Sequence, residues 1–192
     1  MRRGFKTEAE KLAASMRQRL GCTDEEPAPL QEVAGEFGIT VIPADQLIDL
    51  RRLEDLQALQ PDAFSAATFR RPDSTRVIVF NPLHPEGRRR SNIAHEIAHI
   101  ALDHKVRTIE QVGDLKFLTC DLEQEEEADW LGGCLLLPRP LLIKAAFREL
   151  GAPEIAEKYG TSEHMARFRL NASGVLVQVG RARAAKARRA TR

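Results

Sequence analysis

Apolar side chains recur three or four positions apart over most of the chain, which is the pattern of helices that cover a core. Glycine or proline follows several of these segments, as expected where a helix ends. The predicted helices cover residues 5–20, 30–37, 47–56, 85–102 and 122–137, with two or three short ones between 139 and 170. The chain is therefore expected to be mostly helical.

A second pattern, in runs of β-branched and aromatic residues, predicts a few short strands. ITVIP ends at Pro43, and AFSAATF and RVIVF flank a turn with Pro72 and Asp73, which predicts a hairpin. RVIVF is apolar throughout, as in a strand covered on both faces, and GVLVQV is expected to be a closing strand. Residues 103–119 lack periodicity and are expected to form a long surface loop. The predicted fold class is α+β, mostly helical, with a small antiparallel sheet beside the helix at 85–102.

Composition places the chain among globular proteins. With 192 residues, 43% hydrophobic and 30% charged, it is long enough for one domain with its own core. The formal net charge is +1, but the final segment RARAAKARRATR contains no acid, and residues 179–192 are expected to form a flexible basic tail. Three widely spaced cysteines, no visible signal peptide and a longest apolar run of only WLGGCLLLP favour a cytoplasmic protein with no membrane contact.

The stretch RSNIAHEIAHIALDH carries the clearest chemistry. His95 and His99 are four residues apart, which on a helix places both imidazoles on one face, about 40° apart and about 6 Å along the axis. Two ring nitrogens can then bind one ion, and Glu96, about 100° away on the helix, can reach a water without displacing it. Chance would produce about 0.01 such motifs in a chain of this composition. A hydrolytic metal site is therefore favoured over a pair of buried, hydrogen-bonded histidines.

A catalytic zinc ion takes three protein ligands, and DLEQEEEADWLGGCLLLP is the best source of the third. Glu125 and Asp129 are four residues apart there, so Glu125 can bind the metal while Asp129 orients a ligand histidine through its other nitrogen. Gly132 lies on the same face of the helix as Glu125, about 20° from it around the axis, and would let the histidine helix approach closely. His104 and Asp103 are weaker candidates for the third ligand. The expected solvated acidic first turn comprises Glu123, Glu126 and Glu127.

Together these segments resemble the ImmA/IrrE family of metallo-endopeptidases. The matching pieces are VIVFNPLHPEGRRRSNIAHEIAHIALDH and EEEADWLGGCLLLP, and the similarity extends over roughly residues 64–142. Counted back from Pro138, the family's third-ligand glutamate falls on Glu125. The sequence departs from the family at Ser91 and Asn92 and at the WLG that follows Asp129. These departures concern packing more than metal binding.

The resemblance implies a zincin-like minimal core and a cytoplasmic zinc endopeptidase. Its protein substrate would be a helix-turn-helix repressor, whose cleavage relieves repression in a stress-response, mobile-element or toxin–antitoxin context. Mn²⁺ or Fe²⁺ can also occupy such a site in vitro. Glu96 is then the general base, and RVIVF is the expected edge strand that holds an extended substrate.

The end of the chain supports a competing interpretation. EIAEKYGTSEHMARFRL, within residues 153–170, resembles a helix-turn-helix. The alternative is therefore a DNA-binding regulator, or a toxin-type interaction protein, in which the metal is structural. DNA contact through this segment or the basic tail is the less favoured interpretation. The expected organisation is one zinc-peptidase domain at 1–178, with a metallopeptidase core at 61–138 and a helix-turn-helix-like part at 139–172.

Overall fold

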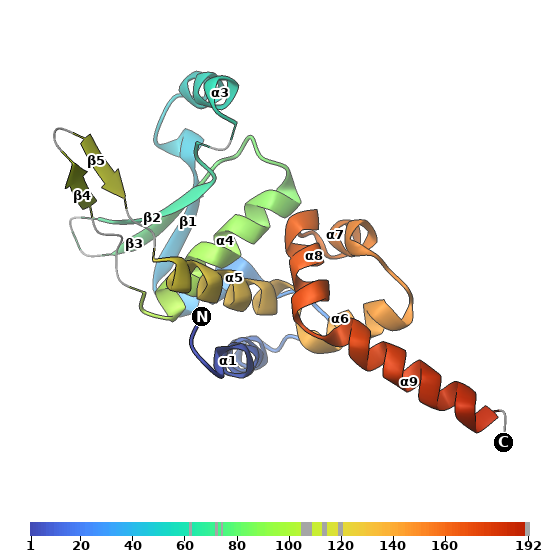
Figure 1. Ribbon diagram of the computed structural model, residues 1–192. Coiled ribbons are helices and arrows are strands. Elements are labelled where there is room, and N and C mark those ends of the chain that lie inside the picture. Colours follow the sequence, from blue (N-terminus) through green and yellow to red (C-terminus); the bar gives the residue numbers. More distant parts are fainter. Residues whose placement is uncertain are drawn as a thin grey trace.

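The computed structural model describes residues 1–61, 63–71, 73, 75–104, 109–112, 115–118 and 121–190 (Figure 1). Its helices are α1 (Phe5–Arg19), α2 (Leu30–Glu36), η1 (Ala44–Gln46, a short 3-10 helix), α3 (Leu50–Leu59), α4 (Glu86–Ala101), α5 (Leu122–Leu136), α6 (Arg139–Phe147), α7 (Ala152–Tyr159), α8 (Glu163–Ala172) and α9 (Val175–Ala190). Its strands are β1 (Ile39–Pro43), β2 (Ala66–Arg70), β3 (Arg76–Phe80), β4 (Ile109–Val112) and β5 (Leu115–Leu118). The predicted class, α+β and mostly helical, is confirmed.

The three-stranded sheet has the order β1-β3-β2, with β3 in the centre. β2 runs antiparallel to β3, as the hairpin predicts, but β1 runs parallel to it, so the expectation of an antiparallel sheet is wrong in this respect. β3 is RVIVF: Ile78 belongs to the main core, whereas Val77 and Val79 pack with Leu53 of α3, so both faces are covered as predicted. RVIVF is consequently not an edge strand. The edges are β1 and β2, and β2 contacts α4.

The pair α4 and α5 forms the centre of the fold. Ala94 and Ala98 of α4 and Ala128 of α5 are fully buried. A Cβ atom added to Gly132 would lie 3.0 Å from the carbonyl carbon and oxygen of Ala94 and 3.1 Å from the nitrogen of His95. This glycine therefore brings the two helix backbones together, as its position in the sequence indicates. The close approach sets the distance between the acids of α5 and the histidines of α4.

Polar contacts hold the N-terminal part of α4. Asn81, after β3, donates from its side chain to the Phe64 carbonyl at 3.0 Å and accepts from the Leu83 N–H at 2.9 Å. Ser91 Oγ donates to the Gly87 carbonyl at 2.9 Å and accepts from the Ser162 N–H at 3.0 Å. Asn81 thereby fixes the segment that leads from β3 to α4, and Ser91 attaches α4 to the turn between α7 and α8. The family departure at Ser91 is indeed a matter of packing.

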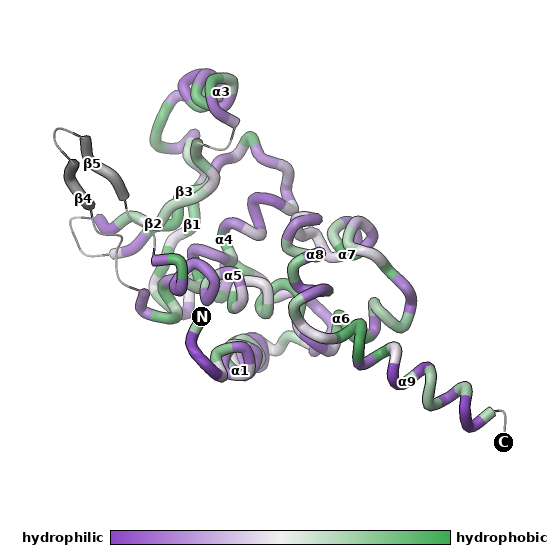
Figure 2. The backbone as a smooth tube through the Cα atoms, in the orientation of Figure 1, coloured by the Kyte–Doolittle hydropathy of each residue, from purple (hydrophilic) through white to green (hydrophobic). Residues whose placement is uncertain are grey.

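Three segments differ from the structure expected for them. GVLVQV begins α9 rather than forming a strand, and its buried residues Val175 and Val179 are four positions apart. α9 projects from the rest of the chain, and hydrophilic residues recur along its outer half (Figures 1 and 2). The predicted basic tail is helical as far as Ala190. β4 and β5 form a hairpin within the predicted loop. Parts of the predictions lie outside the described residues: residue 72 of the hairpin turn, residues 105–108, 113–114 and 119 of the loop, and residues 191–192 of the tail.

Within the described ranges, no single helix has the length and hydropathy needed to cross a membrane. α5 and α6 satisfy the criterion only as a pair, and they are bent by 66° relative to each other.

Candidate metal centre

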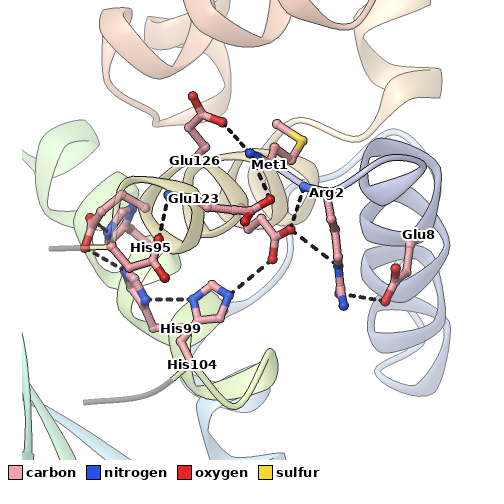
Figure 3. Close-up of polar contacts among 11 residues, drawn as sticks. Met1, Arg2, Glu8, His95, His99, His104, Glu123 and Glu126 are labelled. Atoms are coloured by element: carbon pink, nitrogen blue, oxygen red, sulfur yellow. Dashed lines mark hydrogen bonds and ion pairs between the residues drawn. The ribbon is translucent and has the colours of Figure 1, made fainter. Parts of the chain in front are cut away.

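His95 and His99 of α4 and Glu125 of α5 converge on one point. Figure 3 labels the two histidines. His95 Nε2 is 2.9 Å from His99 Nε2 and 3.1 Å from Glu125 Oε2, and His99 Nε2 is 3.7 Å from Glu125 Oε1. The three side chains are between 18% and 25% exposed, so solvent can still reach them. The structure thus brings together the three residues that the sequence predicts as metal ligands.

Asp129 determines how the His95 ring is presented. Its Oδ1 lies 2.8 Å from His95 Nδ1, and because a carboxylate accepts, Nδ1 carries a proton and Nε2 is the nitrogen that faces the cluster. Burial lowers the pKa of His95, but the hydrogen bonds to Asp129 and Glu125 outweigh it and raise the pKa to about 9. The two histidines in turn lower the pKa of Glu125. The arrangement therefore attracts positive charge, which either a proton or a cation can supply.

The donor set fits a zinc-sized ion. Zn²⁺ binds imidazole nitrogen at about 2.0–2.1 Å in tetrahedral geometry, which separates neighbouring ligand atoms by about 3.3 Å. The two Nε2 atoms are 2.9 Å apart, and the nearest Glu125 oxygens are 3.1 Å from His95 Nε2 (Oε2) and 3.7 Å from His99 Nε2 (Oε1), which is on both sides of this value. Two imidazoles and one carboxylate also leave one tetrahedral position for water or substrate, as in catalytic rather than structural zinc sites.

Glu96 is held from the sheet. Its Oε2 accepts a hydrogen bond of 2.7 Å from the hydroxyl of Thr68, which lies on the edge strand β2. Thr68 could not be identified from the sequence, because nothing in the local pattern of AATFR indicates a contact with a residue 28 positions away. This hydrogen bond connects the predicted general base to the strand that borders the site.

His104 lies against the cluster in a position that the sequence did not predict. Its Nδ1 is 2.9 Å from His99 Nδ1, so it contacts the ring nitrogen of His99 that points away from His95 and Glu125. Glu127 Oε2 lies 3.5 Å from the other nitrogen of His104, and the Glu127 side chain is only 8% exposed. The expectation of a solvated acidic turn is therefore wrong for Glu127, whereas Glu123 and Glu126 are exposed.

A small mixed sheet, a helix with the His-Glu-x-x-His pattern and a second helix that supplies a glutamate define a metallopeptidase-type fold and site. Residues 34–171 match the family described as the IrrE N-terminal-like domain, and the chain belongs to this peptidase family. The chain is also similar to the solved structure of a Mycobacterium tuberculosis transcriptional regulator, with a TM-score of 0.54 and 17% identity. That similarity covers 83% of this chain but only 45% of the regulator, and it shows a shared fold. No curated protein sequence matches significantly.

Proposed function

We propose that this chain is a zinc-dependent endopeptidase that hydrolyses a peptide bond in a protein substrate. The observation that carries the proposal is the convergence of His95, His99 and Glu125, with Glu96 next to them in the sequence and held by Thr68. Membership of a peptidase family supports the same reaction class. A structural metal site needs no acid–base group, so a positioned carboxylate beside three ligands favours catalysis.

Each residue of the site has a separate part in the proposed reaction. His95, His99 and Glu125 would hold Zn²⁺, whose Lewis acidity makes water a nucleophile near neutral pH and polarises a carbonyl. Glu96 would accept the proton of the attacking water and deliver it to the nitrogen of the leaving amine. Asp129 would keep Nε2 of His95 directed at the ion, because it accepts the Nδ1 proton.

β2 is the proposed place for the substrate. It pairs with β3 along one side, and among the described residues no further strand pairs with its other side. An extended peptide can add to such an edge through main-chain hydrogen bonds. Thr68 would then bring that peptide close to Glu96, which its hydroxyl contacts.

A helix-turn-helix repressor is the substrate class that we propose, cut in the cytoplasm so that repression is relieved. The family resemblance supports it, as does the similar fold of a solved transcriptional regulator. The stress-response, mobile-element or toxin–antitoxin setting belongs to the same proposal.

Glu96→Gln tests the reaction. Protein loaded with Zn²⁺ is incubated with a repressor encoded by a neighbouring gene, and the products are resolved by gel and intact mass. Wild type should cut at one site and stop when a chelator removes the metal. Glu96→Gln should keep the zinc stoichiometry but cut at least about 100-fold more slowly, because a general base contributes about 10²–10⁴-fold.

The matched control is Glu86→Gln, in the first turn of the same helix, which should cut like wild type. A Glu96→Gln protein with full activity would refute the proposed base. A wild-type protein that takes up no zinc would refute the proposed site.

A DNA-binding regulator is the second candidate, since α7 and α8 pack as a helical hairpin. Against it, α8 uses one face for packing, and its outer face pairs Arg167 with Glu163. The packing residues, all buried, are Met165, Ala166, Arg169 and Leu170. A regulator of this kind would bind duplex DNA with a steep dependence on salt and would cut no protein.

A further inference from the structure

We infer that His104 is a positioning residue that fixes the His99 ring for metal binding, and that Glu127 holds His104 in place. The inference rests on the proposed metal site and concerns what keeps that site in shape. It gives a role to two residues that the metal ligands and the proposed base leave unexplained.

The way α4 ends brings His104 to His99. Asp103 follows the helix with a φ of 50°, in the left-handed region. The Asp103 N–H donates to the Ile100 carbonyl at 3.1 Å and the His104 N–H to the His99 carbonyl at 3.0 Å, which are the two bonds of a Schellman motif. In a continuing helix His104 would point about 140° away from His99. Because the chain turns back instead, the ring centres of the two histidines are 5.0 Å apart.

Metal binding by His99 selects one arrangement of protons along this contact. If Nε2 presents its lone pair to the ion, Nδ1 carries the proton and donates to His104 Nδ1, 2.9 Å away. His104 then carries its own proton on Nε2, which faces Glu127 Oε2 at 3.5 Å. Arg2 approaches the other oxygen of Glu127 with its backbone N–H at 3.3 Å and its Nε at 3.4 Å.

Both ligand histidines are therefore backed by a carboxylate. Asp129 contacts His95 directly, whereas Glu127 contacts His104, which in turn contacts His99. Figure 3 shows the rings of His99 and His104 side by side. The side chains of His104 and Glu127 are only 7% and 8% exposed. Buried polar groups of this kind are costly without partners. His104 Nδ1 has the His99 ring nitrogen as its partner, whereas the buried Nε2 makes no hydrogen bond and has the Glu127 carboxylate beside it at 3.5 Å.

Zinc affinity, measured by competition with a chromogenic chelator, tests the inference without any cleavage assay. His104→Leu fills a similar volume but offers no acceptor, whereas His104→Asn offers a side-chain carbonyl to the His99 Nδ1–H. Loss of such an outer partner costs about 10–100-fold in metal affinity, so we expect this loss for His104→Leu and less than about threefold for His104→Asn.

Glu127→Gln provides a second, milder test, with an expected loss of about fivefold. Its matched control is Glu126→Gln, which removes the same charge one residue away from a side chain that is 62% exposed. This control should bind zinc like wild type. Thermal unfolding of the metal-free proteins checks that each variant is folded. If His104→Leu is not folded, the comparison of zinc affinity between Glu127→Gln and Glu126→Gln tests the inference.

Equal zinc affinity in wild type, His104→Leu and Glu127→Gln would overturn the inference and leave the metal site intact. A zinc affinity of His104→Asn as low as that of His104→Leu would also overturn the inference, because packing rather than an accepted hydrogen bond would then matter. A wild-type protein without zinc would overturn the proposed function together with this inference. Zinc binding with the expected affinities but no cleavage would refute only the proposed peptidase activity.

Discussion

The hydrogen bond between Thr68 and Glu96 ties the proposed base to a residue of the edge strand. A carboxylate that accepts from a hydroxyl on one oxygen keeps a defined orientation, and its other oxygen is left for proton transfer. The same hydroxyl sits on the strand along which we place the substrate. In the proposed reaction, proton transfer and substrate position would be coupled through this one side chain.

Thr68→Val should lower kcat about tenfold with little change in KM, because a hydrogen bond to a charged group contributes about 1.5 kcal/mol and the shape of the strand is kept. Thr68→Ser restores the hydroxyl and should recover most of the rate. Initial rates of repressor cleavage at several substrate concentrations separate the two constants. A serine variant as slow as the valine variant would argue against hydrogen bonding as the cause.

The residues of the site were predictable to the extent that their contacts arise within one helix. The four-residue spacings of His95 and His99, and of Glu125 and Asp129, place each pair on one face in any helix. Thr68 and His104 were not predictable in this way. The first contact depends on how the sheet packs on α4, and the second on a left-handed residue where α4 ends.

Between elements, the decisive feature is the contact of α4 and α5 at Gly132. The added methyl of Gly132→Ala would meet the backbone at Ala94 and His95, which cannot turn aside as a side chain can. The helices must therefore separate by a few tenths of an ångström. Glu125 and Asp129 lie on the displaced helix, so their distances to the histidines should lengthen.

We expect Gly132→Ala to destabilise the protein by about 1–3 kcal/mol, as overpacking does, and to weaken zinc affinity. Gly35→Ala is the matched control, because Gly35 lies within α2 and a Cβ there meets nothing within 4 Å. That change should be neutral or stabilise the protein by up to about 1 kcal/mol through helix propensity. Urea unfolding and chelator competition measure both effects, and equal behaviour of the two variants would contradict the argument.

Element types were harder to predict where apolar runs are short. GVLVQV predicts a strand by its composition, but an apolar run of this length is equally compatible with a helix, and Val175 and Val179 are buried with helical spacing. The parallel direction of β1 could not be read from ITVIP either. Strand direction depends on how the connection through α3 returns to the sheet, and the pattern of the strand itself carries no such information.

The buried guanidinium of Arg169 joins distant parts of the chain. Arg169 of α8 has no exposed side-chain surface, and its Nη2 donates to Glu10 of α1 at 2.7 Å and to the Leu137 carbonyl after α5 at 3.2 Å. It thus connects the helix-turn-helix-like part to α1 and to the end of the helix that carries Glu125. The stability of the peptidase core should depend on this contact.

Glu10→Gln should lower the free energy of unfolding by about 2 kcal/mol, less than the 3–5 kcal/mol of a fully buried pair, because Glu10 is 26% exposed. The control Glu8→Gln removes an acid from the same helix, where it pairs with Arg2 and both side chains are more than half exposed. That loss should stay below about 1 kcal/mol. Urea unfolding of the metal-free variants makes the comparison. Equal unfolding midpoints for Glu10→Gln and Glu8→Gln would show that the buried pair does not stabilise the protein. A loss of about 2 kcal/mol also predicts a melting temperature about 4–8 °C lower in a chain of this size, since each kcal/mol corresponds to about 2–4 °C.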